Sequence, residues 1–237
     1  LSFFQMQEVQ NSHKLHLVGG SATDKTADPK YVCIDMLPTE ARVLSLGLSW
    51  VTQAGFDAAM LQAGHKVVAV DPSVPSFYTA WKLGQMFPKF SFLAKAVTGE
   101  DGLIKVRYEK NNEFEMAAVS SHNDFKDFEK ETYREVESVS LDSLIKLYGG
   151  FDVLQMNIEG FEYGILDSIK SLDIAQVIVS FHHRCCEEFL LEDTLDCIDK
   201  MQDLGYETVD IHDIDPEWVP NPNEELMFIK PSSSKKL

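Results

Sequence analysis

The sequence predicts an α/β protein built on a doubly wound, mostly parallel sheet. Short apolar runs typical of buried strands alternate with segments of helical period along most of the chain. Because crossovers between parallel strands are right-handed, the carboxyl ends of these strands should meet at one edge, where ligands bind. The last two strands are joined by a loop and not by a helix, so one of them should run antiparallel to the rest.

Seven strands and five main helices are expected in order along the chain. The strands are predicted at 42–47, 66–71, 90–97, 151–157, 176–181, 206–211 and 225–230. The helices are predicted at 52–63, 76–87, 141–147, 163–169 and 187–204, several of them closed by glycine or proline. A capping helix is expected at 31–37, and a turn at 99–102 leads to a hairpin through 104–108.

We expect residues 1–237 to form a single domain. Residues 1–40 would be an N-terminal cap, and residues 231–237 a disordered tail. The acidic stretch 109–137 is predicted to be a solvated loop or edge hairpin within this domain, because it lacks the Pro/Gly/Ser composition of a linker.

The charge balance excludes some classes of partner. The chain of 237 residues has 38 acidic and 21 basic residues, which gives a net charge of −17 that should repel nucleic acid and anionic membrane surfaces. No apolar run reaches the roughly 20 residues that cross a bilayer, so no membrane-spanning segment is expected within the chain. A cytoplasmic location is slightly favoured, and an upstream signal or anchor stays open because the chain starts at Leu1.

The cysteines favour neither a disulfide framework nor a metal site. Their spacing contains no CxxC pair, so they are expected to be mostly buried thiols, and no metal site is expected; they are Cys33, Cys185, Cys186 and Cys197.

A first candidate binding element follows the strand 42–47. Gly47, Leu48 and Ser49 form a turn there, and Asp71 ends the next strand 24 residues after Gly47. A glycine lets the backbone approach a ligand, and an acid about 20 residues later can bind ribose hydroxyls. Since the three close glycines of a dinucleotide fingerprint are missing, the residues indicate nucleoside binding without a pyrophosphate cradle, or equally a tight turn with a capping or surface Asp.

A second group of polar residues ends two later strands. Asn157 and Glu159 follow the strand 151–157, and His182 and His183 follow the strand 176–181. Because both strands should end at the same edge, His182 is expected near Asn157 and Glu159. The alternative is that Asn157 and Glu159 only cap the following helix, whose first turn favours carboxylates.

Two stretches of the chain carry a family resemblance. VSLDSLIKLYGGFDVLQMNIEGFEYGILDSI, followed by VIVSFHHR, resembles the FkbM-type S-adenosylmethionine-dependent methyltransferases. Their pattern is a Leu-Asp-Ser-Leu helix, a strand ending Lys-Ile-Asp-Val-Glu-Gly, and a later strand ending Glu-x-His. The segments PKYVCIDM, VLSLGLSWVTQAGFDAAML and HKVVAVDPS resemble the methyltransferase-like branch found in animals, in which a Ser-Phe-Gly type turn replaces the glycine-rich loop.

The resemblance covers about residues 31–183 and implies a class I methyltransferase (Rossmann-like) fold of seven strands, the last one antiparallel. It also implies S-adenosylmethionine as the cofactor. By position, the Gly47 turn would approach the methionine part, Asp71 would hold the ribose, and Val97 would flank the adenine. The full set of expected cofactor-binding residues is Gly47, Leu48, Ser49, Asp71, Pro72 and Val97.

The same resemblance implies a methyltransferase that acts on a hydroxyl of a small molecule or sugar. Glu159 and His182, with Asn157, are the candidate catalytic residues, and the ordinary pKa of histidine, about 6.5, suits His182 as a general base. His183 is a candidate substrate residue, as is Trp218, whose loop 212–223 would be a lid or acceptor wall; equally, Trp218 would pack onto the core.

The chain departs from the family pattern at two positions of the expected centre. Asn157 replaces an Asp and Ser180 replaces a Glu, which weakens the case for a metal-assisted mechanism. The alternative function is therefore a catalytically silent domain that binds adenosylmethionine or a protein partner. A nicotinamide-dependent oxidoreductase is disfavoured by the missing glycine triplet.

Overall fold

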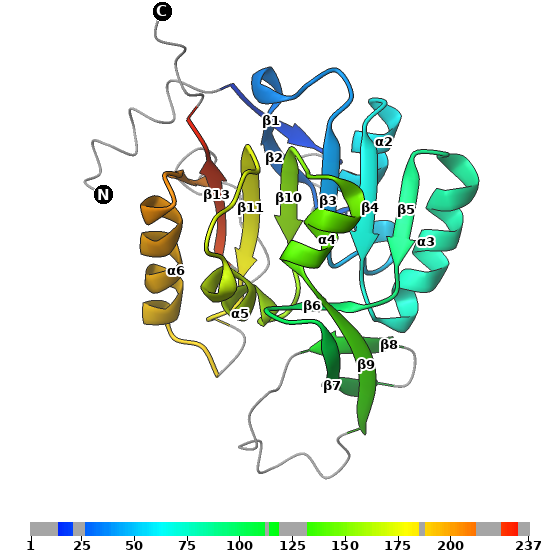
Figure 1. Cartoon of the computed structure of the whole chain (residues 1–237). Helices are drawn as coiled ribbons and strands as arrows, with labels where there is room; N and C mark the ends of the chain where they lie inside the picture. The colour runs from blue at the N-terminus through cyan, green and yellow to red at the C-terminus, as the bar shows by residue number, and fades with distance from the viewer. Residues whose placement is uncertain are drawn as a thin grey trace, which may run out of the picture.

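The computed structural model describes residues 14–20, 27–111, 114–118, 132–184, 188–211 and 224–231. Its main sheet has seven strands in the order β12-β13-β11-β10-β3-β4-β5 (Figure 1). In chain order they are β3 (Arg42–Leu46), β4 (Lys66–Val70), β5 (Phe90–Leu93), β10 (Val153–Met156), β11 (Gln176–Phe181), β12 (Glu207–Asp210) and β13 (Glu224–Ile229). β13 runs antiparallel to β11 and β12, while β11, β10, β3, β4 and β5 are parallel, so the doubly wound sheet with an antiparallel last strand is confirmed.

Helices cover both faces of this sheet, because alternate residues of each strand point to opposite sides. Leu44 and Leu46 of β3 pack in one hydrophobic cluster with α4 (Leu141–Tyr148), α5 (Phe161–Ser168) and α6 (Leu191–Asp203). Val43 of β3 packs in a second cluster with α2 (Gly55–Gln62) and α3 (Val74–Met86). Figure 1 shows α4 and α5 in front of the sheet and α2 behind it. All five helices predicted from the sequence are present, and the one expected at 52–63 starts with a 3-10 turn, η3 (Val51–Gln53).

The capping helix predicted at 31–37 is wrong. Residues 30–33 form strand β2 (Lys30–Cys33), which pairs antiparallel with β1 (Leu15–Val18), and only a 3-10 turn, η2 (Ile34–Met36), follows. The side chain of Gln176 on β11 accepts a hydrogen bond from the Cys33 N–H at 2.8 Å and donates one to the Cys33 carbonyl at 2.9 Å. Tertiary contacts therefore hold this segment extended, with Val32 and Cys33 buried.

A second sheet differs from the sequence expectation. The strand predicted at 90–97 ends at Leu93, and the chain resumes as β6 (Ala96–Thr98), which belongs to a four-stranded sheet in the order β6-β9-β7-β8. The other members are β7 (Gly102–Asn111), β8 (Phe114–Ala118) and β9 (Thr132–Ser140), so hairpin strands occupy the described ends of the acidic stretch 109–137. Figure 1 shows this smaller sheet beyond the carboxyl ends of the parallel strands.

The organisation into one domain stays a prediction. Both hydrophobic clusters pack on the same seven-stranded sheet, which agrees with it. The described part of the expected N-terminal cap, residues 14–20 and 27–40, forms the β1–β2 hairpin and the turn that leads to β3. Residues 1–13, 21–26 and all of the expected tail except Pro231 lie outside the described residues.

Candidate active site

The turn after β3 lies directly against the end of β10. The N–H of Gly47 donates to the Val70 carbonyl of β4 at 3.1 Å, and the N–H of Asn157 donates to the Leu46 carbonyl at 3.0 Å. Gly47 has a φ of 91°, in the left-handed region, and a Cβ added there would collide with the carbonyl oxygen of Asn157. Only glycine therefore allows the predicted cofactor turn and the predicted catalytic segment to approach so closely.

Gly47→Ala is expected to lower the free energy of unfolding by more than about 3 kcal/mol, because it combines left-handed backbone strain with a clash against backbone that cannot rotate away. Urea unfolding measures this loss. Gly84→Ala is the matched control: Gly84 lies in helix α3, and a Cβ added there has no atom within 4 Å. Alanine at 84 should be neutral or stabilising by up to about 1 kcal/mol. Equal effects of the two substitutions would contradict the close approach.

Asp71 organises the same turn. Its carboxylate is buried, and Oδ2 accepts the backbone N–H groups of Leu48 at 2.8 Å and Ser49 at 3.0 Å. Oδ1 accepts the N–H of Ser73 at 2.7 Å. Ser49 has a φ of 52°, so these bonds hold a non-glycine residue in an unfavourable conformation. Because a carboxylate has about four acceptor positions, Asp71 keeps capacity for a hydroxyl, and its ribose role stays a prediction.

The other two expected cofactor residues are placed differently. Pro72 follows Asp71 at the edge of the sheet and is half-buried. Val97 does not follow the third strand of the main sheet but lies on β6, where it pairs with Val139 and is buried in the core. With 5 % of its surface exposed, Val97 offers little contact area to an adenine ring in this conformation.

The turn after β10 carries the predicted catalytic residues in an irregular backbone. Glu159 has a φ of 54°, and Gly160, which caps α5, has a φ of 103°. The first turn of α5 contains Glu162, a fully buried carboxylate whose Oε2 accepts the N–H of Gly160 at 2.9 Å. A residue with a positive φ, held by a buried carboxylate, is the kind of strain that marks a functional segment.

His182 is held by the same buried carboxylate. Its Nδ1 lies 2.7 Å from Oε1 of Glu162, which also accepts the backbone N–H of His182 at 3.1 Å. Its Nε2 lies 3.7 Å from Oε2 of Glu159. Burial alone lowers the pKa of His182, but the contacts with Glu159 and Glu162 outweigh burial and raise it to about 10. The imidazole is therefore protonated near neutral pH, and this geometry does not fit the expected general base.

The predicted residues thus come together in part. Glu159 and His182 are neighbours, as expected, and the Glu159 side chain is 34 % exposed while His182 is fully buried. The side-chain amide of Asn157 instead donates to Oδ2 of Asp28 at 3.3 Å, in the segment before β2.

The two expected substrate residues lack structural support. His183 lies with Nδ1 2.9 Å from the Thr194 hydroxyl and Nε2 3.5 Å from Oε2 of Glu224, so both ring nitrogens face protein groups. Its side chain is 7 % exposed. Trp218 and its loop, 212–223, lie outside the described residues. Any role of these residues in binding the acceptor stays a prediction.

Sequence reasoning missed four charged residues near the site: Glu162, Asp28, Lys30 and Glu225. For Glu162 a signal existed, because it is the acidic residue in the first turn of α5, only three residues after Glu159. For Asp28, Lys30 and Glu225 no local pattern marks a role, since charged residues in a short strand or in the segment before one normally face solvent.

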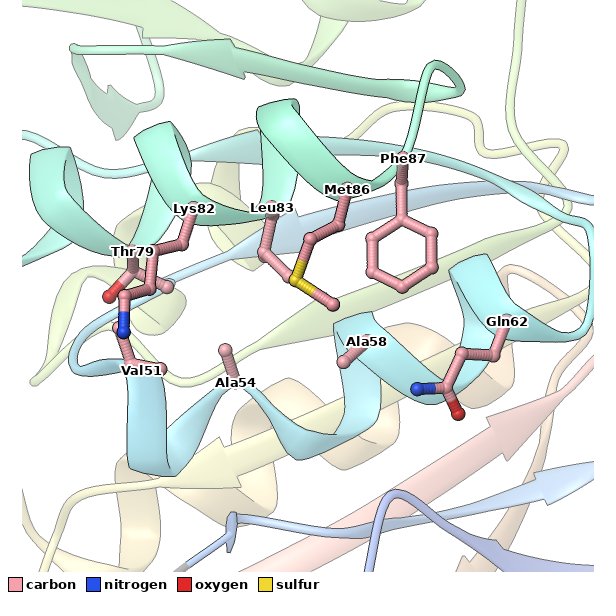
Figure 2. Close-up of a pocket in the computed structure, with 9 residues that line it drawn as sticks. All are labelled: Val51, Ala54, Ala58, Gln62, Thr79, Lys82, Leu83, Met86 and Phe87. Carbon is pink, nitrogen blue, oxygen red and sulfur yellow. The ribbon is translucent and has the colours of Figure 1, made fainter.

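An apolar groove of about 180 Å³ lies between α2 and α3 (Figure 2). Its lining residues are Val51, Ala54, Ala58, Gln62, Thr79, Lys82, Leu83, Met86 and Phe87, none of which was expected in the site. The hydroxyl of Thr79 donates to the Ser49 carbonyl at 2.8 Å, so one end of the groove adjoins the cofactor turn. The lining is mostly apolar, and its polar side chains are those of Gln62, Thr79 and Lys82.

The described part of the chain contains neither a metal-ligand cluster nor a membrane-spanning helix. It contains no group of three or more His, Cys, Asp or Glu residues placed to hold a metal ion. Among the same residues, no helix is both long and apolar enough to span a bilayer. Cys33 and Cys197, the two cysteines in the described ranges, are buried and form no disulfide, as expected for these two.

The strand order and the antiparallel last strand are those of the class I methyltransferase fold. A family model, the methyltransferase FkbM domain, matches residues 50–208, and the chain belongs to this family. No curated protein matches. Among solved structures, Methanococcus jannaschii fibrillarin is similar at 10 % identity over 91 % of this chain and 88 % of that chain, with a TM-score of 0.48.

Two further solved structures resemble the chain at the level of the fold. Aeropyrum pernix fibrillarin, with natively bound S-adenosyl-L-methionine, shares 12 % identity over 81 % of this chain and 67 % of that chain, with a TM-score of 0.42. The CurJ carbon methyltransferase shares 8 % identity over 84 % of this chain and 51 % of that chain, with a TM-score of 0.42.

Proposed function

We propose that this protein transfers a methyl group from S-adenosylmethionine to a hydroxyl of a small molecule or sugar. The observation that carries the proposal is the contact between the Gly47 turn and the end of β10, where Asn157 lies two residues before Glu159. Membership of the FkbM methyltransferase family supports the reaction class. The hydroxyl acceptor rests on the family resemblance of the sequence.

The residues at the carboxyl edge fit this cofactor in their chemistry. Bound S-adenosylmethionine supplies an electrophilic methyl group on a sulfonium, and transfer is an in-line displacement in which alignment provides much of the acceleration. Gly47 lets the backbone approach the ligand closely, and Asp71 has free acceptor capacity for the ribose hydroxyls.

Glu159 is the residue proposed to take the proton of the acceptor hydroxyl as the oxygen bonds to the methyl carbon and the carbon–sulfur bond breaks. Its side chain is partly exposed, whereas His182 is buried and already protonated near neutral pH. His182 therefore acts as a positioning residue, which holds Glu159 and Glu162 in place as a cation between two carboxylates.

Asp71→Ala is expected to weaken adenosylhomocysteine binding about tenfold or more, the usual effect of losing charge-assisted hydrogen bonds. Isothermal titration calorimetry measures the dissociation constant. Because Asp71 also holds the N–H groups of Leu48 and Ser49, this variant should lose stability as well. Asp71→Asn keeps one acceptor oxygen for the N–H groups of Leu48 and Ser49. This variant therefore separates the loss of stability from the loss of adenosylhomocysteine affinity. An unchanged dissociation constant in both variants would remove Asp71 from the cofactor site.

A second candidate function is a catalytically silent domain that binds adenosylmethionine or a protein partner. Asn157 favours it, since an amide at this edge cannot act as a base. A thermal-shift screen with adenosylmethionine, adenosylhomocysteine, NAD and NADP separates the possibilities. A ligand at 100 times its dissociation constant should add about 2.7 kcal/mol of stability. Binding of adenosylmethionine without turnover on any hydroxyl acceptor would favour the silent domain, and binding of NAD alone would overturn both.

A further inference from the structure

A lysine ammonium is buried beside the candidate active site. Lys30 on β2 is 1 % exposed, and its Nζ lies 2.7 Å from Oδ1 of Asp28, 2.7 Å from Oε2 of Glu225 and 3.5 Å from the Ser180 hydroxyl. Burial alone lowers the pKa of Lys30, but the two carboxylates outweigh burial and raise that pKa above its ordinary value. The two carboxylates are needed here, because burying a lysine ammonium without an anionic partner would greatly lower the free energy of unfolding.

This ammonium is connected to the end of β10. Ser180 pairs with Glu225 in the β11–β13 register, and Met156 pairs with Val179, so the next residues, Asn157 and Ser180, lie at the same level of the sheet edge. Asp28 completes the connection, since its Oδ1 binds Lys30 and its Oδ2 accepts the Asn157 amide. Asp28 is therefore shared between the cation and the residue beside Gly47.

This cluster already has an excess of negative charge with neutral residues at 157 and 180. Asp28 and Glu225 carry two negative charges against the single positive charge of Lys30. Asp57, also fully buried, interacts with both Asp28 and Lys30, and burial raises its pKa to about 7. A carboxylate in place of Asn157 would lie about as close to Asp28 as the amide does, at 3.3 Å, where like charges strongly disfavour each other.

We propose that Lys30 is a resident cation of the carboxyl edge, and that through Asp28 it sets the orientation of the Asn157 amide beside the cofactor turn. Asp28, Lys30 and Glu225 all lie outside residues 50–208, the range that matches the family model. The donor set does not fit a divalent ion, because the lysine occupies the space between the two nearest carboxylates. This inference rests on the proposed function. It implies that methyl transfer here is independent of divalent cations, and it assigns Lys30 and Asp28 as positioning residues.

The amide orientation follows from the same contacts. Only Nδ2 of Asn157 can donate to the Asp28 carboxylate, so Oδ1 is the atom left over. Among the described residues, this Oδ1 is buried and has no hydrogen-bond partner, as is also true of Oε1 of Glu225. Through Asp28, Lys30 thus leaves the side-chain acceptor oxygen of Asn157 without a partner among the described residues.

Lys30→Met tests the resident cation. Removing one partner of a buried charge cluster should lower the midpoint of thermal unfolding by about 10 °C. In Lys30→Ala, whose short side chain leaves space between Asp28 and Glu225, Mn²⁺ alone should recover part of the loss by replacing the missing positive charge. Mn²⁺ should leave the wild-type midpoint unchanged. Lys66→Met is the matched control, since Lys66 is half-exposed in an ion pair with Glu40 and should lose little stability. An unshifted midpoint in Lys30→Met, or a wild-type midpoint that Mn²⁺ raises equally, would overturn the proposal.

A charge swap tests the link to Asn157 even if Lys30→Met does not fold. Asn157→Asp alone should lower the unfolding midpoint by placing two carboxylates together. Asp28→Asn/Asn157→Asp should recover part of this loss, because one amide and one carboxylate are again paired, although the ion pair between Asp28 and Lys30 is missing. Failure of the double variant to recover over the single one would contradict the positioning role. Adenosylhomocysteine affinity, measured on the wild type and on the double variant, tests the proposed function separately, since the unfolding midpoints do not depend on it.

Discussion

Glu159→Gln is expected to slow methyl transfer by about 100-fold or more, the usual scale for the loss of a general base. The amide keeps the size of the side chain and its ability to accept a hydrogen bond but does not take up a proton. Because the Gly47 turn and Asp71 are unchanged, adenosylhomocysteine affinity should stay within about threefold of the wild type. Single-turnover kinetics with a hydroxyl acceptor, together with calorimetry, measure the two effects.

Asp167→Asn is the matched control, because Asp167 is another carboxylate of the same helical region, on α5, with a side chain 92 % exposed. This variant should keep both activity and affinity. An equal loss in the two variants would point to a general effect of charge. Full activity of Glu159→Gln would remove Glu159 from proton transfer and favour an acceptor that ionises without help from the protein.

His182 is expected to make stability fall strongly as the pH rises from about 6.5 to 10. Its pKa is raised to about 10 in the folded protein, against about 6.5 in the unfolded chain. The folded state therefore binds the extra proton through this window, so the stabilisation is complete below about pH 6.5 and is lost as the pH passes the folded value. For a fully buried group the loss amounts to a few kcal/mol. Urea unfolding at a series of pH values measures it.

His182→Gln should flatten this part of the profile, since Gln can donate to Glu162 but does not titrate. Asp57 provides an internal check in a different window. Its pKa of about 7, raised mainly by burial, means that the folded state holds a proton that the unfolded chain loses near pH 4. The effect of Asp57 is therefore a fall in stability as the pH rises from about 4 to 7. Above pH 7 the further fall is due to His182. An unchanged slope above pH 7 in His182→Gln would contradict the protonated imidazole.

Much of the fold could be predicted from the local pattern of apolar and polar residues. The runs Val43–Leu46, which contains the buried Ser45, and Val67–Val70 are mostly apolar because both faces of a central parallel strand are buried. This signal does not depend on distant residues. The segment 31–37 was misread because short apolar runs suit a strand and a helix equally well. Pairing with β1 and the two bonds to Gln176 decide in favour of the strand.

The site was accessible to a smaller extent. Strand ends at a common edge predict that Glu159 and His182 are neighbours, and they are. Their protonation could not be predicted in the same way. The reference pKa suggests a base for His182, but the contacts with Glu159 and with the fully buried Glu162 raise its pKa and make it a cation near neutral pH. Electrostatic shifts depend on distance and burial, and neither can be obtained from residue spacing.

The sequence by itself determined the class of fold, the carboxyl edge as the place of the site and the family motif around Glu159, because these depend on hydrophobic period, connection rules and short contiguous patterns. Only the tertiary structure decided that Lys30, 150 residues from Ser180 and 195 from Glu225, supplies a buried positive charge to that edge. The physical reason is that local pattern reports which side chains leave water, whereas the partner of a buried charge is set by which distant segments the folded backbone brings within hydrogen-bond distance.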